Sequence, residues 1–435
     1  PAIGPDGTIY FDDIDNNVYA VSDDGALLWI VDALLGQQGT GSEGPVVVGD
    51  DGIIYVGTNP LGPTVEIVAF NPDGSHKWTY TAPQALTWVA GPGIGPDGRI
   101  YGVLNSAQLF DQSYDVVALN TDGSIAWTNA ADPLVHENAA QGFELVFAPS
   151  TPGGPVDQLL FTADLFAVET FGRVWAFDLA DGSQNFAEVM NPAGPGTTLG
   201  NCQLAGNQDT GELYGFEFNG IGGGGYGLQA LDSTGNRMWH FDPGIASDVT
   251  HPAVGADGSI YFGWDLGRLT AVNPDGSERW TNFEPVIYNG PMPSPMAPLL
   301  LAIGKQGFNE PSFIEGRHTT DGDLLWSQTI VDDQSKDVSV DSRPRFAPDG
   351  QSAYFSALEL PITPTSTFRV FAIDTSDESS ITGDMNEDGS VGVQDLLALL
   401  AAWGECGGSP CPADIDDSGA VDVNDLLKLL SNWTG

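Results

Sequence analysis

Short apolar runs separated by Asp-Gly turns recur along most of the chain. The clearest unit reads, in order, an apolar run at 46–48, Asp51-Gly52, a run at 53–55, a run at 67–70, Asp73-Gly74 and Trp78. Asp-Gly favours tight hairpin turns because Gly adopts positive φ without strain and Asp tolerates it. The pattern therefore predicts two β-hairpins, or four short strands, in each unit.

The unit recurs eight times within the first 374 residues. Its last strand carries an aromatic residue in seven of the eight copies, namely Trp29, Trp78, Trp127, Phe186, Trp239, Trp280 and Trp326. A repeat of roughly 40 to 60 residues with four strands is typical of a β-propeller, in which stacked blades bury each other's faces. We expect an all-β propeller over residues 1–374, with eight blades favoured and seven as the alternative.

The segment from Val68 to Trp78 shows the motif of the repeat most clearly. Val68-Ala69-Phe70-Asn71 is followed by Asp73-Gly74, and the Trp comes four residues after the Gly. This motif resembles the tryptophan-docking repeat of pyrroloquinoline-quinone-type propellers, and the resemblance covers roughly residues 1–374. It implies the fold, but it carries little information on activity, because many proteins with this fold bind no quinone.

The eighth unit lacks the sequence of a fourth strand. After Asp374 the chain turns polar, with Thr375-Ser376-Asp377-Glu378 in the place where a Trp strand is expected. Either residues before Pro1 close the ring, or the blade has three strands, or its open edge accepts a strand of another chain. Because the chain begins at Pro1 and not at Met, we expect that an N-terminal segment has been removed.

A polar linker at 375–383 precedes a second domain at 384–435. Two twelve-residue loops with the EF-hand arrangement of oxygen ligands lie within this domain, each with Gly at position 6, where the loop turns sharply. The predicted ligands are Asp384, Asn386, Asp388, Ser390 and Asp395 in the first loop, and Asp414, Asp416, Ser418, Ala420, Asp422 and Asp425 in the second. Each loop leads into an amphipathic helix, expected at 396–403 and 426–433. The spacing predicts two bound calcium ions.

The duplicated loop–helix units resemble a type I dockerin over almost all of residues 384–435. Asp in place of Glu at position 12 and the absence of a helix before the first loop belong to this resemblance. It implies a cohesin-like protein partner and contacts at loop positions 10 and 11, which are Val393, Gln394, Val423 and Asn424 here. The sequence departs from the family in its Cys-containing connector and in the Val at position 10.

Composition excludes several partner classes. With 13 basic and 59 acidic residues, the net charge is −46, so nucleic acid is a poor partner. No apolar stretch is long enough to span a membrane.

Cys406 and Cys411 lie close together in a Gly/Pro-rich connector, and we expect a disulfide between them, with free thiols as the alternative. A disulfide indicates an extracellular or cell-surface location.

The sequence shows no catalytic constellation. A quinone-dependent dehydrogenase of this fold is expected to carry adjacent cysteines and cationic groups around the quinone, whereas here no two cysteines are adjacent and basic residues are scarce. We expect Arg343 and Arg345 to be exposed strand-end cations, with the central channel as the alternative, and His251 to lie at the start of an inner strand. The favoured hypothesis is an extracellular, non-catalytic propeller that attaches through its calcium module to a cohesin-like protein or to another copy, forming a matrix or filament. The alternatives are a dockerin-borne carbohydrate-active or quinone-dependent enzyme and an envelope scaffold.

Overall fold

The structure is a computed structural model of the 435-residue chain. It describes residues 1–13, 16–40, 45–60, 64–83, 85–106, 113–130, 145–164, 172–189, 204–218, 226–243, 249–264, 267–283, 287–288, 290–305, 311–331, 337–340, 343–347, 350–359, 368–375, 385, 391–405, 413–415 and 419–431.

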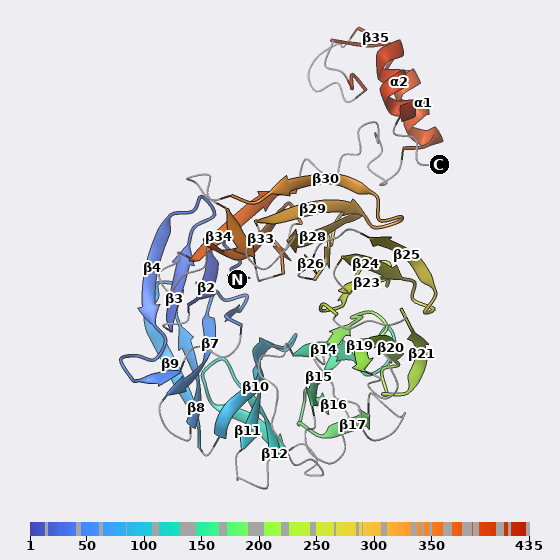
Figure 1. The fold of residues 1–435 in the computed structure, drawn as a ribbon. Coiled ribbons are helices and arrows are strands. Elements are labelled where there is room, and N and C mark those ends of the chain that lie inside the picture. Colours follow the sequence, from blue (N-terminus) through green and yellow to red (C-terminus); the bar gives the residue numbers. More distant parts are fainter. Residues whose placement is uncertain are drawn as a thin grey trace.

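Eight antiparallel sheets stand around a central axis and form a β-propeller (Figure 1). Within each blade, consecutive strands run from the centre of the ring to its rim, so that β14 lies near the axis and β21 near the periphery. The eight-bladed form of the predicted fold is therefore confirmed, and the seven-bladed alternative is excluded.

The blades follow one another in the order of the chain. Blade one contains β1 (Ala2–Ile3), β2 (Ile9–Asp12), β3 (Asn17–Val21) and β4 (Leu27–Asp32); blade two contains β5 (Gly39–Thr40), β6 (Val47–Val48), β7 (Ile54–Pro60), β8 (Thr64–Phe70) and β9 (His76–Pro83); blade three contains β10 (Ala85–Ile94), β11 (Ile100–Ser106), β12 (Ser113–Leu119) and β13 (Ile125–Ala130); blade four contains β14 (Val146–Pro149), β15 (Val156–Asp164), β16 (Gly172–Asp178) and β17 (Gln184–Val189).

The second half of the ring is built in the same way. Blade five contains β18 (Leu204–Gly206), β19 (Leu213–Phe218), β20 (Tyr226–Leu231) and β21 (Arg237–Phe241); blade six contains β22 (Ala253–Val254), β23 (Ile260–Trp264), β24 (Arg268–Val272) and β25 (Glu278–Phe283); blade seven contains β26 (Ile287–Tyr288), β27 (Met292–Pro293), β28 (Leu299–Lys305), β29 (Ser312–His318) and β30 (Leu324–Thr329); blade eight contains β31 (Val338–Val340), β32 (Arg345–Phe346), β33 (Ser352–Glu359) and β34 (Phe368–Asp374).

A row of three residues crosses most blades in the same register. In blade two, Tyr55 on β7 pairs with Ala69 on β8, and Ala69 pairs with Trp78 on β9. The small Ala leaves the indole close to the Tyr ring, with the two ring centroids 5.7 Å apart. The same row recurs as Tyr10–Ala20–Trp29, Tyr101–Ala118–Trp127, Tyr214–Ala230–Trp239 and Tyr261–Ala271–Trp280.

Each tryptophan of this row also fastens its blade to the next one. Trp78 donates its Nε1 hydrogen to the carbonyl of Thr121 at 3.0 Å, across the boundary between blades two and three. The equivalent bonds are Trp29 to Pro72 at 2.8 Å, Trp127 to Leu179 at 2.9 Å, Trp239 to Pro274 at 2.8 Å and Trp280 to Thr319 at 3.0 Å. In blade four the predicted Phe186 occupies the position and pairs with Ala176.

The hydrophobic core lies between neighbouring blades. One buried cluster joins Tyr55 and Ile67 of blade two to Ile100 and Val117 of blade three. Another joins Leu301 of blade seven to blade eight. Each blade buries its faces against two neighbours, and this burial stabilises the ring. Each Å² of apolar surface removed from water contributes about 25 cal/mol to the free energy of folding.

The C-terminal part contains the only helices among the described residues. These are α1 (Val393–Ala401) and α2 (Val423–Ser431), with a two-stranded ladder of β35 (Gly404–Glu405) and β36 (Ala420–Val421). Each helix begins three residues before the predicted start, because its third residue, an Asp, binds the main-chain N–H just before the helix. In the part of the chain that the structure describes, no helix is long and apolar enough to cross a membrane.

Candidate functional site

Two carboxylates at the helix starts of the C-terminal part are fully buried. Asp395 accepts hydrogen bonds from the main-chain N–H of Met385 and of Gly392, both at 2.8 Å. Asp425 accepts one from the N–H of Asp422 at 2.7 Å. Both side chains are 0% exposed. Both position-12 carboxylates therefore accept a hydrogen bond from the main-chain N–H just before their helix, as expected of two equivalent units.

The other predicted ligands are described only in part. In the second loop, Asp414 accepts a hydrogen bond from the N–H of Gly419 at 2.7 Å, Asp422 accepts one from the N–H of Asn424 at 2.7 Å, and Ala420 lies in β36. The predicted ligands Asp384, Asn386, Asp388, Ser390, Asp416 and Ser418 and the predicted disulfide partners Cys406 and Cys411 lie outside the described residues. Among the residues that are described, no three His, Cys, Asp or Glu side chains gather in a metal-binding group, so the two calcium sites stay a prediction.

The two helices of the C-terminal part share a small apolar core. Leu399 of α1 and Leu429 of α2 are fully buried, and they pack with Val391, Ala413 and Val421. Leu396 and Leu426 add to this cluster from its edge. Each helix contains two pairs of adjacent leucines, at 396–397 and 399–400 in α1 and at 426–427 and 429–430 in α2. In every pair, the first leucine contributes to the core.

The side of each helix next to this core is apolar as well, and it is exposed. Val393 and Val423, two of the predicted partner-binding residues, are 60% and 54% exposed, and Gln394 and Asn424 beside them are exposed too. On each helix, two exposed leucines follow the Val at intervals of four and then three residues. They are Leu397 and Leu400 on α1 and Leu427 and Leu430 on α2. We call these six Val and Leu residues the outer helix face.

The sequence analysis missed the four leucines of the outer helix face. It assigned the leucines of each helix to one apolar side. The signal was present, because adjacent leucines in a helix lie about 100° apart, so that Leu399 and Leu400 cannot both point into a narrow core. Exposed apolar residues in such a contiguous arrangement mark interaction surfaces.

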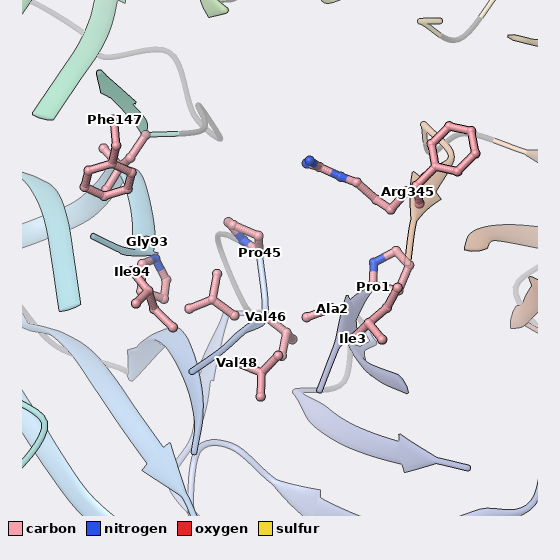
Figure 2. A pocket seen from close by; sticks show the side chains of 14 residues that line it. Pro1, Ala2, Ile3, Pro45, Val46, Val48, Gly93, Ile94, Phe147 and Arg345 are labelled. Atoms are coloured by element: carbon pink, nitrogen blue, oxygen red, sulfur yellow. The ribbon is translucent and has the colours of Figure 1, made fainter. Parts of the chain in front are cut away.

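A second candidate site lies at the centre of the propeller, where inner strands of five blades meet around a cavity of about 430 Å³ (Figure 2). Its walls are mainly apolar, and they are formed by Pro1, Ala2, Ile3, Pro45, Val46, Val47, Val48, Pro92, Gly93, Ile94, Leu145, Phe147, Arg345 and Phe346. Arg345 extends from β32 into the open space. The lining therefore combines apolar side chains with the cationic side chain of Arg345.

The positions of Arg343 and Arg345 correct the sequence-based prediction. Both were expected to be exposed at a strand end, but both are only partly exposed, since β32 is the innermost strand of its blade. Burial lowers the pKa of Arg343 to about 10 and also lowers the pKa of Arg345. Burial, and then the positive charge of Arg343, lower the pKa of His251 to about 3, so the imidazole is neutral at neutral pH.

Comparison with known proteins supports the propeller repeats. Residues 14–184, which span less than half of the chain, match the family described as "Outer membrane protein assembly factor BamB". No curated protein sequence matches the chain.

Solved propellers with low sequence identity share the fold. BamB from Moraxella catarrhalis is 14% identical, with a TM-score of 0.52 over 80% of this chain and 88% of that one. The Dos1 propeller is 11% identical, with a TM-score of 0.54 over 81% and 88%. The C-terminal WD40 domain of Sif2 is 11% identical, with a TM-score of 0.51 over 86% and 94%. At this level of identity the likeness shows the fold alone.

Proposed function

We propose that this protein is a non-catalytic propeller that acts outside the cell and is attached to a protein partner by a calcium-dependent, dockerin-like module at 384–435. The observation that carries the proposal is the outer helix face, which repeats on both helices. A soluble domain of this size gains nothing from leaving six large aliphatic side chains in water, whereas a docking module needs such a surface.

The residues present fit calcium. The groups that the motif assigns are all oxygen donors, which a hard cation prefers: they belong to side chains except at position 7, where Ser390 and Ala420 would offer main-chain carbonyls. Asp395 and Asp425 each bury a carboxylate, and a buried negative charge needs compensation from hydrogen bonds or a cation. A domain of about 50 residues also has a small core and commonly depends on a metal or a disulfide for its stability. Calcium would neutralise the loops and hold the helix starts in place.

The experiment that tests calcium dependence is scanning calorimetry of the whole chain with calcium and with chelator. The expected result is a small transition that moves to lower temperature when calcium is removed, while the larger propeller transition stays unchanged. A single transition that is insensitive to calcium contradicts the proposal.

Attachment is tested by capture of partners from the native source with calcium, with chelator, and with the double variant Leu397→Asp/Leu427→Asp. The variant removes apolar surface from the outer helix face but leaves every predicted ligand in place. The proposal requires a partner that is lost both with chelator and with the variant. If the captured proteins are the same in all three conditions, the module is not a docking device.

A scaffold for envelope assembly is the second candidate function. It is favoured by the family match of residues 14–184, because the description of that family names an outer membrane assembly factor. In this case the partner binds the propeller, and its capture is unaffected by chelator and by the Leu397→Asp/Leu427→Asp variant.

A further inference from the structure

The outer helix face has the residue spacing of a contact between two helices. On α1, Val393, Leu397 and Leu400 follow one another at intervals of four and three residues, and the three residues of α2 repeat these intervals. Alternating intervals of four and three place apolar side chains in one row along a helix, and a second helix packs against such a row in coiled coils and bundles. The spacing therefore indicates that the occupant of this face is itself a helix.

The outer helix face is continuous with the small core of the C-terminal part. Leu396 of α1 lies partly buried at the edge of that core, and the adjacent Leu397 is 59% exposed. On α2, Leu426 is likewise partly buried at the edge of the core, and Leu427 is 60% exposed. Each helix is therefore apolar over a wider arc than its own core uses, as is a helix with neighbours on two sides in a bundle. An added helix would extend the existing core.

The face carries almost no charge, although the chain is strongly acidic. The only acidic side chains of the two helices, Asp395 and Asp425, are 0% exposed. Among the helix side chains that the structure describes, the one exposed charged group belongs to Lys428, which donates to the carbonyl of Ile415 at 3.2 Å. The net charge of −46 therefore acts on a partner from around the face. It favours a partner with an apolar row and basic flanks.

We propose that the outer helix face binds an amphipathic helix of a partner protein, with apolar residues at alternating intervals of three and four and with Lys or Arg beside them. This inference rests on the proposed function and specifies the partner of its docking module. The apolar row of the partner covers the exposed Val and Leu residues, and its basic flanks are attracted by the acidic chain. A second copy is a poorer occupant, because its own charge of −46 opposes the approach.

The test uses a fluorescent synthetic peptide of about 18 Leu and Lys residues, which is long enough to form a helix when bound. In this seam peptide the leucines alternate at intervals of three and four. A control peptide has the same composition in an order that spreads the leucines around the helix. Each peptide is titrated against the whole chain in calcium at physiological salt and followed by anisotropy. The seam peptide should bind saturably, and the control should bind at least about tenfold more weakly.

Two double variants of equal charge locate the site. Leu397→Asp/Leu427→Asp should weaken binding of the seam peptide at least about tenfold. Ile125→Asp/Met238→Asp adds the same charge at propeller positions that are 54% and 47% exposed, and it should bind as the parent chain does. Leu397→Ala/Leu427→Ala, which adds no charge, should weaken binding in the same direction as the Asp variant. The proposal is overturned if Leu397→Asp/Leu427→Asp binds like the parent chain, or if the two peptides bind equally, because the acidic chain would then attract any cationic peptide.

Sedimentation velocity in calcium and flotation with phosphatidylcholine vesicles test the other occupants of the face. The proposal expects a chain that is monomeric and does not float with the vesicles in the absence of peptide. If the chain forms a dimer or binds the vesicles, and Leu397→Asp/Leu427→Asp abolishes that association, a second copy or a lipid surface occupies the face and the proposal is wrong.

Failure of this inference gives a different result from failure of the proposed function. If the module unfolds in a calcium-dependent transition and captures a partner from the native source, but the seam peptide does not bind, the proposed function stands and the helical occupant is wrong. If calcium changes neither the unfolding nor the capture, the proposed function itself fails.

Discussion

The indole of Trp78 lies against Gly123 of the next blade, so closely that a Cβ added to Gly123 would come within 2.7 Å of the ring. The same indole donates its hydrogen to the carbonyl of Thr121, two residues earlier. This contact explains why an Asp-Gly turn and a tryptophan recur together in the sequence. The glycine is required twice, once for its positive φ and once for the absence of a side chain beneath the ring.

Gly123→Ala should therefore destabilise the propeller more than the same change at Gly25. The two positions share a positive φ, of +83° and +85°, so the backbone strain of about 1 kcal/mol is common to both. Only Gly123 adds a clash with an indole, which should contribute a further 1–3 kcal/mol or so, as for other overpacked sites. Urea denaturation of the two variants measures the difference. Equal losses would show that the ring contact is energetically neutral.

Trp127→Phe should cost more stability than Trp29→Phe. The hydrogen bond from Trp127 to Leu179 is buried, whereas the one from Trp29 to Pro72 is exposed to water. The carbonyl of Leu179 also accepts a hydrogen bond from Nη1 of Arg99 at 2.8 Å, so Trp127→Phe removes one buried hydrogen bond and leaves no orphaned carbonyl, at a cost of about 0.5–1.5 kcal/mol. At the exposed site, water replaces the donor, and a change below about 0.5 kcal/mol is expected. Thermal unfolding of both variants tests the order, and a larger loss at Trp29 would contradict it.

Repetition explains why the propeller could be predicted from the sequence. The turn, the small residue and the aromatic of each blade lie within about a dozen residues, so they form a local signal, and even Phe186 was placed correctly in a degenerate unit. The short inner strands carry no such signal. β32 has only two residues, too few to show which side chain faces the axis, and the prediction for Arg345 was wrong for this reason.

The helices of the C-terminal part show a second kind of feature that the sequence alone could not predict. Their periodicity predicts an apolar face, but with leucines at both positions of each pair it does not say which leucine points inward. That choice depends on the partner elements, here the other helix and the ladder residue Val421. The helix starts were misplaced because Asp395 and Asp425 act in the first helical turn as well as in the loops.

Lowering the pH below 6.5 should destabilise the parent chain relative to the variant His251→Gln. The pKa of His251 is about 3 in the folded protein and 6.5 in its reference state, so the unfolded chain binds more protons between these values. The contribution of the neutral imidazole is fully present above pH 6.5 and falls by at most about 1.4 kcal/mol per pH unit towards pH 3.

The measurement for His251 is urea denaturation of both proteins at pH 8, 7, 6 and 5. The difference in stability between the parent chain and the variant should be constant from pH 8 to 7 and should shrink or reverse at pH 5. Because the comparison is between two proteins that share all 59 acidic residues, titration of the carboxylates cancels. A difference that stays constant down to pH 5 would show that His251 is protonated without cost in the folded protein.

Asp395→Asn should reduce the number of bound calcium ions from two to one. The substitution keeps the size of the side chain but removes the buried negative charge that the first loop offers to a cation. Isothermal titration calorimetry of the whole chain measures the stoichiometry. Asp24→Asn, in an exposed hairpin turn of blade one, is the control and should retain two ions. If Asp395→Asn also retains both, Asp395 is not a ligand.

Neighbouring leucines of α1 should respond in opposite ways to the same substitution. Leu399 is 0% exposed and Leu400 is 48% exposed. Leu399→Asp buries a carboxylate in the small core and should abolish the calcium-dependent unfolding transition, a loss of at least about 3 kcal/mol. Leu400→Asp places the same group in water and should leave the midpoint of that transition within a few degrees. Both effects are read by calorimetry in calcium. If Leu400→Asp melts the module as well, the outer helix face is part of its core and is not available to a partner.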